Sequence, residues 1–458
     1  MFRTLLHVFQ VKELRNKLLF TLGMLVVYRI GFWIPLPGVD QTRMIEFFRT
    51  AVETDSAAGR AAQYVAIFSG GSFSQSTIFG LGIMPYITAS IIFQLVSSAS
   101  PALKKIQEDG PSGRAKIQEW TRYATVGLCI IQAIGWLSYI KATGLVMPQY
   151  ANNPVWWLTA VSALTAGTVF LMWLGEQIDR FGIGNGVSMI ITAGILTGMP
   201  NAINTLARSY DKTGADGLNA LGILMLAGGF VLIVGGAVLL TVAQRRIPIQ
   251  QAKHTRGRRV YGGQRSYLPL RVNHSGVMPI IFASSLMIFP SVILEAIGAA
   301  AKDAGDGWWV GALQALGGWF QMGEYPYVIA YIIMVYFFSF FWVTVQFNPE
   351  DMAKQLRDHG SFIPGLRPGP RTAEYLESVI GRITYVGAGF LSIIAVLPMV
   401  VNKSLNIDFA VTQFLGGTGL LIVVSVTLDL LQRIEANLLM RNYSGFLGGE
   451  ESKSPRMR

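Results

Sequence analysis

Long runs of apolar residues, separated by polar loops, dominate the sequence. A bilayer core about 30 Å thick is crossed by roughly 20 helical residues, so apolar runs near that length predict transmembrane helices. We identify ten runs, at 18–35, 78–96, 121–140, 155–174, 187–199, 221–243, 276–299, 325–347, 383–400 and 411–431. The fifth run, 187–199, is the shortest, because glycines precede it and Pro200 follows it. The pattern therefore predicts an all-α polytopic membrane protein.

The positions of Lys and Arg between these runs test the topology, because cytoplasmic loops of membrane proteins carry an excess of positive charge. Most of the Lys and Arg residues lie before the first run, in every second loop, and after the last run. The densest stretches are the loops 243–276 and 348–373. Both termini are therefore predicted to be cytoplasmic, as an even number of spans requires. We expect no cleavable signal peptide, because the first apolar run is full length.

The ten runs divide the chain near Asn219 into two sets of five. Inverted repeats of this kind commonly build a membrane pathway with a site between two halves. We therefore expect an N-terminal half at 1–218, a C-terminal half at 219–440 and a cytoplasmic tail at 441–458.

The overall composition supports a membrane protein. Of the 458 residues, 52% are hydrophobic and 14% are charged, whereas a soluble domain has roughly 25% charged residues. This composition disfavours a soluble globule. The net charge of +11 could indicate binding to nucleic acid. Its concentration in alternate loops favours a role in setting the topology instead.

Residues that could carry out chemistry are scattered along the chain. The four histidines, His7, His254, His274 and His359, lie in separate loops without the spacing of a metal site. Cys129 is the only cysteine and lies in an apolar run, so disulfides and thiol catalysis lack a partner. No glycine-rich loop leads into Lys and Ser or Thr, as nucleotide hydrolysis would require. We predict no enzyme activity, no metal and no cofactor.

Two other classes of membrane protein need polar groups within the spans: a secondary transporter of small solutes and an intramembrane enzyme. The predicted spans contain few such groups. Arg29 lies towards the outer end of the first span, and four carboxylates lie near cytoplasmic ends. Those carboxylates are Glu176, Asp179, Asp429 and Glu435. Their positions disfavour both classes, without excluding an ion-coupled transporter.

The stretch 64–79, YVAIFSGGSFSQSTIF, does not fit the pattern of full spans. Its apolar part, 64–68, is too short to cross a bilayer, and Gly70 and Gly71 break a continuing helix. The stretch is either an interfacial loop or a re-entrant half-helix lying in a cavity. Periodicity alone does not choose between them.

Six segments, in order, match patterns of one protein family. Two of them, YRIGFWIPLPGVD and GLGIMPYITASIIFQL, lie at 28–40 and 80–95, and WLGEQIDRFGIGNGVSMII lies at 173–191. A long basic segment at 245–285 begins RRIPIQQAKHTRGRR and ends GVMPIIFASS. The last two, FNPEDMAKQLRDHGSFIPGLRPGPRT and GGTGLLIVVSVTLDLL, lie at 347–372 and 416–431. With these motifs the chain resembles the SecY/Sec61-alpha family of protein-translocation channels over nearly its whole length.

The resemblance implies two pseudo-symmetric five-helix halves around an hourglass pore, closed by a ring of apolar side chains and a plug half-helix. Such a channel translocates unfolded secretory polypeptides across the plasma membrane and releases transmembrane segments into lipid through a lateral gate. Matched by motif, the ring consists of Ile83, Ile87, Val187, Ile191, Ile281 and Ile422. Val187 stands where the family commonly has Ile, and it keeps the branched apolar character.

The same matching places the plug at 64–74, which favours the half-helix for that stretch. Its marked residues are Tyr64, Phe68, Gly70, Gly71 and Phe73. The lateral gate is formed by the runs 78–96, 121–140, 276–299 and 325–347, with Gln94 and Asn273 as polar members.

The resemblance also implies partners and a location. The partners are the small membrane subunits SecE and SecG, the SecA motor ATPase, the ribosome, polypeptides bearing signal sequences, and membrane lipids. The location is the bacterial plasma (inner) membrane. Six arginines in the basic loops are expected to dock SecA or the ribosome, and Arg367, within GLRPG, is singled out for motor-driven translocation. The six are Arg245, Arg246, Arg256, Arg258, Arg259 and Arg367.

Overall fold

The chain is mostly helical and divides into two compact units. The first comprises Met1–Asn201 and Val426–Arg458, and the second comprises Ala202–Ser425. The computed structural model describes residues 11–53, 76–150, 153–208, 220–251, 254–256, 259–261, 265–274, 276, 278–284, 286–287, 324–405 and 418–447.

Six helices in the described part of the chain are long and apolar enough to cross a membrane. They correspond to six of the runs predicted from the sequence. These helices are α8 (Pro111–Ala142), α9 (Pro154–Phe181), α10 (Gly186–Arg208), α11 (Ala220–Val242), α14 (Tyr325–Gln346) and α16 (Pro370–Leu405). A shorter apolar helix, α6 (Met84–Ala99), covers most of the predicted run 78–96.

The remaining three predicted runs are largely helical where they are described. The helix α2 (Lys12–Ile30) covers most of the first run, and α18 (Thr418–Leu447) contains the described part of the last. Of the seventh run, residues 278–284 and 286–287 are helical. The full set of ten spans stays a prediction.

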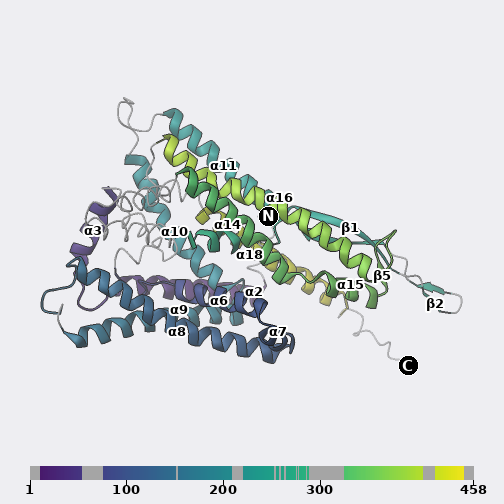
Figure 1. Ribbon diagram of the computed structural model, residues 1–458, viewed down its shortest axis with the longest axis horizontal. Coiled ribbons are helices and arrows are strands. Elements are labelled where there is room, and N and C mark those ends of the chain that lie inside the picture. Colours follow the sequence, from purple (N-terminus) through teal and green to yellow (C-terminus); the bar gives the residue numbers. More distant parts are fainter. Residues whose placement is uncertain are drawn as a thin grey trace, which may run out of the picture. The chain divides into compact units, whose positions relative to one another are not determined.

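The first unit is built around α8 and α9, which lie side by side in Figure 1, with α6 against α8 and α2 against α9. Small and apolar side chains, among them Cys129, Ala133, Ala160 and Leu164, are fully buried where these helices meet. Gly167 on α9 lies so close to the loop before α6 that a Cβ there would overlap the Ile78 carbonyl oxygen. The shorter elements are η1 (Gly31–Trp33), α3 (Gln41–Glu53) and α7 (Pro101–Glu108).

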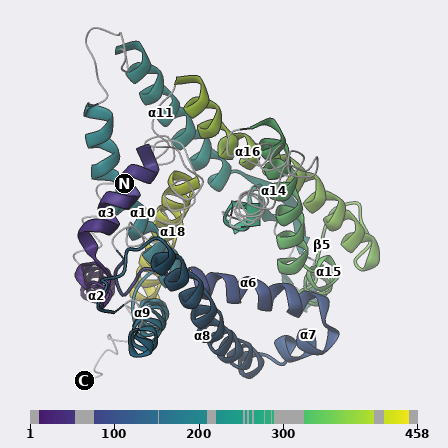
Figure 2. The same ribbon diagram turned by 60° about the vertical axis from the view of Figure 1, so that its left-hand side comes forward.

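The second unit packs α11 and α14 against α16, as Figures 1 and 2 show. The helix α15 (Pro349–Asp358) lies against the first turns of α16. Its first turn is capped by Asn348, whose Oδ1 accepts a hydrogen bond from the Glu350 N–H at 3.2 Å. The apolar core here includes Ile247, Leu270, Val343, Ile363, Leu376 and Val379.

The loop 243–276, predicted only as a polar connection in an all-α fold, contains β-structure. Strands β1 (Gln244–Gln251) and β4 (Arg265–Arg271) pair antiparallel, with Ile247 opposite Leu268, and β5 (Ser361–Phe362) pairs with the other edge of β1. Two further strands, β2 (His254–Arg256) and β3 (Arg259–Tyr261), pair with each other and lie between β1 and β4 in the sequence. The strands form because β1 alternates: Ile247 and Ile249 are buried while Arg246 and Pro248 are exposed.

Candidate functional site

The ring residues expected in α6 lie at its very start. Ile83 immediately precedes the helix, and Ile87 follows one turn later, where its N–H donates to the Ile83 carbonyl oxygen at 3.1 Å. Because the two are four residues apart, they share one face of the helix. Ile83 is 1% exposed and Ile87 is 8% exposed. Burial of this kind suits a closed constriction and ordinary packing equally, so their place in a pore stays a prediction.

The segment before α6 is tied to the end of α2. The Leu36 N–H donates to the Ser76 carbonyl oxygen at 2.9 Å, and the Ile78 N–H donates to the Ile34 carbonyl oxygen at 3.1 Å. Gly31 contacts the ring of Phe79 so closely that a side chain at position 31 would overlap it. These contacts fix where α6 starts, and so they fix Ile83. The predicted plug at 64–74, including Tyr64, Phe68, Gly70, Gly71 and Phe73, lies outside the described residues.

The other two ring residues of the first unit lie in the first turns of α10. Val187 is half-buried and Ile191 is 4% exposed, and they too are spaced by four residues. The position that a Cβ of Gly175 would take on α9 lies 3.6 Å from the Val187 Cγ2 atom. The packing of α10 against α9 therefore determines where Val187 lies.

Charged side chains of α8 and α9 form one ion pair and one contact with the start of α10. The Arg122 Nε atom on α8 lies 2.7 Å from the Glu176 Oε1 atom on α9. One turn later, the Asp179 Oδ1 atom accepts a hydrogen bond from the Gly186 N–H at 2.7 Å. Glu176 is thus paired with a cation, and Asp179 accepts a hydrogen bond from the backbone of α10.

Ile281 and Ile422, the remaining ring residues, belong to the second unit. Ile281 is 3% exposed and its carbonyl oxygen accepts a hydrogen bond from the Ser284 hydroxyl at 3.0 Å. Ile422 lies near the start of α18 and is 1% exposed. Both are apolar and buried, and the ring that would combine them with the first unit stays a prediction.

The polar residues assigned to the lateral gate differ in their surroundings. Gln94 is exposed on α6, whereas Asn273, between β4 and the helical residues 278–284, is 9% exposed. Beside Asn273, the Val272 carbonyl oxygen lies against α16, only 2.6 Å from where a Cβ of Gly387 would be. The segment after β4 is therefore held against α16 through backbone contact.

His274 follows in the same segment and packs edge to face on Phe347, with 4.3 Å between the ring centroids. Burial lowers the pKa of His274, and the nearby charge of Arg271 acts in the same direction. A hydrogen bond with the backbone of Arg271 opposes this shift. The imidazole is consequently held neutral more firmly than an exposed histidine.

Four of the predicted docking arginines lie on strands of the second unit. Arg245 and Arg246 are exposed on β1, and Arg246 stands opposite Pro269 of β4. Arg256 and Arg259 face each other across the β2–β3 hairpin, and Arg258 lies outside the described residues. The antiparallel pairing thus makes Arg256 and Arg259 direct partners in the register of β2 and β3.

Arg367 lies on an exposed turn that is anchored on both sides. Before it, Ile363 is 4% exposed, and the Leu366 N–H donates to the Ile363 carbonyl oxygen at 3.1 Å. After it, the Thr372 hydroxyl donates to the Arg367 carbonyl oxygen at 2.9 Å. Gly365 and Gly369 have φ angles of 86° and 124°, which only glycine adopts without strain. The turn presents the Arg367 side chain to solvent from a rigid base.

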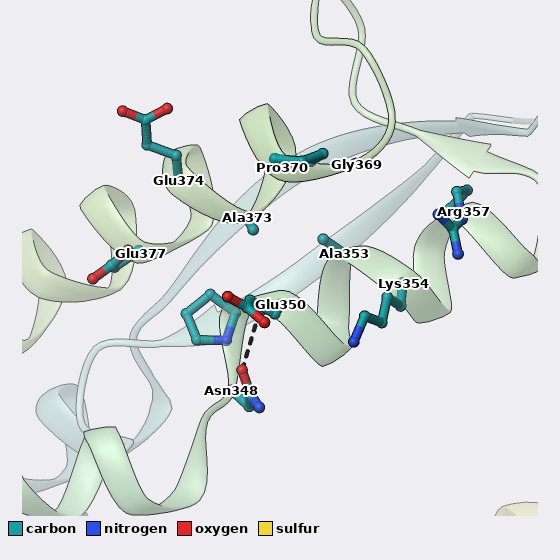
Figure 3. Close-up of a pocket in the computed structure, with 11 residues that line it drawn as sticks. Asn348, Glu350, Ala353, Lys354, Arg357, Gly369, Pro370, Ala373, Glu374 and Glu377 are labelled. Atoms are coloured by element: carbon teal, nitrogen blue, oxygen red, sulfur yellow. Dashed lines mark hydrogen bonds between the residues drawn. The ribbon is translucent and has the colours of Figure 1, made fainter.

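A groove of about 580 Å³ lies next to this turn, between α15 and the start of α16. Figure 3 shows Glu374 and Glu377 on the α16 wall and Lys354 and Arg357 along α15. Small or apolar residues also line the groove, among them Ala353, Gly369, Pro370 and Ala373. The groove adds a concave surface of mixed charge to the loop 348–373.

Sequence reasoning missed the Arg122–Glu176 pair and the strands. The two charged residues are 54 positions apart, so no local pattern joins them. The strands did have a signal, the alternation of polar and apolar residues in RRIPIQQ at 245–251. Within the described ranges, no three His, Cys, Asp or Glu side chains lie together as metal ligands would.

Comparison with protein families gives one match that spans most of the chain. The family model SecY matches residues 77–431. The chain is 37% identical to the protein translocase subunit SecY of Chlamydia muridarum over 467 residues, covering 99% of this chain and 100% of the relative. It is 42% identical to the subunit of the same name from Streptomyces scabiei over 451 residues, covering 96% and 98% of the two chains.

Solved structures with a similar fold are also channels. A structure described as a protein conducting channel gives a TM-score of 0.57 at 18% identity, covering 96% of this chain and 95% of that one. A structure described as showing that the plug domain of the SecY protein stabilises the closed state of the translocation channel gives 0.56 at 18% identity, with the same coverage. Sec61 in a canine ribosome–channel complex gives 0.54 at 16% identity, again with 96% and 95% coverage. At these identities the likeness concerns the fold.

Proposed function

The chain belongs to the SecY family, and from that premise we propose that it is the channel subunit of a Sec translocase in a bacterial plasma membrane. It moves unfolded secretory polypeptides across the membrane and releases transmembrane segments into lipid through a lateral gate. The observation that carries this function is identity of 37% to a bacterial translocase subunit over 99% of the chain.

The proposed architecture has ten spans in two halves, 1–218 and 219–440, with a cytoplasmic tail at 441–458 and both termini cytoplasmic. Alternation of Lys and Arg between loops supports this orientation. An aqueous path is needed because a charged residue at a helix centre costs about 2.5–3.5 kcal/mol on insertion scales. An apolar span prefers lipid, so a channel that opens sideways can sort segments by their own transfer free energy.

The seal consists of Ile83, Ile87, Val187, Ile191, Ile281 and Ile422, with 64–74 as the plug. Branched apolar side chains can exclude water from a narrow constriction and still separate around a passing polypeptide. Support comes from the sequence motifs in which the six positions lie and from the branched apolar side chain that each of them carries. Gln94 and Asn273 are the polar members of the gate.

The partners are SecE and SecG in the membrane, and SecA and the ribosome at the loops 243–276 and 348–373. Exposed Arg245, Arg246 and Arg367 stand on well-packed strands and turns, which suits a docking surface. Arg256, Arg258 and Arg259 extend this surface at the hairpin. Ribosomal RNA would be met through its phosphates, with an affinity that falls steeply with salt.

Translocation by the purified complex tests the function directly. The chain is co-expressed with its small membrane subunits, reconstituted into vesicles, and supplied with SecA, ATP and a preprotein. Protection of the preprotein from added protease is the expected result, and it should disappear when the signal sequence is deleted. The proposal would be contradicted if the vesicles neither protected the preprotein from protease nor inserted a membrane-protein substrate.

A further inference from the structure

The connection between α9 and α10 is a short corner, residues 182–185, that joins the helices at a charged contact. Asp179, in the last turn of α9, accepts a hydrogen bond from the N–H of Gly186, the first residue of α10, at 2.7 Å. That N–H belongs to the first turn of a helix, where no carbonyl oxygen of the same helix can reach it. A carboxylate also interacts favourably with the positive end of the helix dipole.

The two helices also touch through their backbones at this corner. A Cβ at Gly186 would overlap the Gly175 carbonyl oxygen. Glycine is therefore required at position 186, and its N–H is brought within reach of the Asp179 carboxylate. The hydrogen bond and the close contact act on the same residue of α10.

A third contact ties the corner to α2. The Ile183 N–H donates to the Thr21 hydroxyl oxygen at 3.1 Å, and Thr21 is 4% exposed. The Asn185 Oδ1 atom then caps α10 by accepting a hydrogen bond from the Ser188 N–H at 3.1 Å. With the corner held from α2 and from α9, the direction in which α10 leaves it is restricted.

We propose that Asp179 is a positioning residue for the pore seal, which sets Val187 and Ile191 by holding the first turn of α10 against α9. The inference rests on the proposed function, in which those two residues belong to the ring. Val187 is adjacent to the anchored Gly186, and Ile191 follows one turn later on the same face. Loss of the anchor frees the end of α10 that carries both side chains.

Two substitutions at position 179 separate the hydrogen bond from the charge. Asp179→Ala removes the acceptor, and Asp179→Asn retains an oxygen that can accept from the Gly186 N–H. The readout is resting ion conductance of the reconstituted translocase complex in planar bilayers. We expect Asp179→Ala to raise the resting open fraction severalfold, as loss of one hydrogen bond at an exposed carboxylate implies. Asp179→Asn should restore most of the seal.

Controls identify which proposal fails. Glu119→Ala removes another exposed carboxylate, one that accepts from the Tyr123 hydroxyl at 3.0 Å, and should leave the conductance unchanged. Ile191→Asn tests the ring itself: if it does not leak, the ring proposal fails. If it leaks while Asp179→Ala does not, the positioning role of Asp179 is overturned.

Stability separates positioning of the seal from a merely structural role. Thermal unfolding of each purified variant is measured beside its conductance. A lower melting temperature for Asp179→Ala without extra leak would overturn the inference, as would equal leak from Asp179→Ala and Asp179→Asn. If Asp179→Ala yields no folded complex, Asp179→Glu displaces the same acceptor by one methylene. It should leak more than wild type, and a wild-type seal would again overturn the inference.

Discussion

The guanidinium of Arg122 on α8 lies 2.7 Å from the carboxylate of Glu176 on α9, and the two side chains are 38% and 16% exposed. The pair joins two helices whose other contacts are largely apolar. One turn beyond it, the Asp179 carboxylate binds the backbone of Gly186 instead. The ion pair is therefore a contact between α8 and α9, separate from the one between α9 and α10.

Removing Arg122 should destabilise the first unit. Arg122→Ala leaves the Glu176 carboxylate without its partner in a largely enclosed place. Partial exposure of the arginine reduces the effect, so we expect a loss of about 1–2 kcal/mol in unfolding free energy. Unfolding of the purified protein in detergent, followed by fluorescence, measures the loss.

A double-mutant cycle isolates the pair. Arg122→Ala combined with Glu176→Gln removes the unpaired charge, so the double variant should be less destabilised than the sum of the single variants. Additive losses would show that the two side chains do not stabilise each other.

The sequence predicted the membrane helices well where the whole helix is apolar, as in α11 and α14, and less well where a helix extends into water. The helix α8 begins at Pro111 and α16 at Pro370, ahead of the apolar runs that begin at 121 and 383. The first turns of these two helices are polar, and a search for apolar runs therefore leaves them out. The strands β1 and β4 were missed for a related reason, since a short alternating pattern is weaker than a long apolar one.

The candidate site depended on resemblance much more than on pattern. Ile83 and Ile191 are two of many apolar residues in spans, and no periodic feature distinguishes them. Contacts between distant segments, such as Thr21 with Ile183 or Asp179 with Gly186, need the folded chain to be seen. Exposed Arg245 and Arg246 were predictable, because charge density marks a loop whatever its structure.

Stability of the second unit should depend on pH through His274. Burial lowers the pKa of His274 relative to the unfolded value of about 6.5. Protonation consequently favours the unfolded state: stability is full above pH 6.5 and is lost as the pH falls through the lower folded pKa. We expect the melting temperature to fall between pH 7 and pH 5, and to fall less in His274→Gln. His359→Gln, at an exposed position, is the control. Its melting temperature should fall between pH 7 and pH 5 as much as that of the wild type.

Reversing charge in the basic loops should weaken docking of the ribosome and SecA. Changing Arg256, Arg258, Arg259 and Arg367 to Glu removes contacts to phosphates and adds repulsion. Ribosome binding, measured by co-sedimentation with vesicles at several salt concentrations, should weaken, and each lost phosphate contact should reduce the salt slope by about 1. SecA-driven translocation should fall in parallel, chiefly through Arg367.

The matched control for docking is Lys141→Glu, at an exposed position in a loop predicted on the opposite side of the membrane. It should leave ribosome binding and transport unchanged. Unaltered binding and transport in the correctly inserted fourfold variant would mean that these arginines set topology only.

The apolar ring should fail when it becomes polar. Ile191→Asn, Ile281→Asn or Ile422→Asn would stabilise water in the constriction and favour the open state, so resting ion leak should increase. The same variants should export substrates with defective signal sequences, and deletion of 64–74 should add to the leak while translocation continues. Leu239→Asn and Ile131→Asn, at positions 70% and 67% exposed on α11 and α8, are the matched controls. Equal leak from the two sets in planar bilayers would show that the ring residues pack and do not gate.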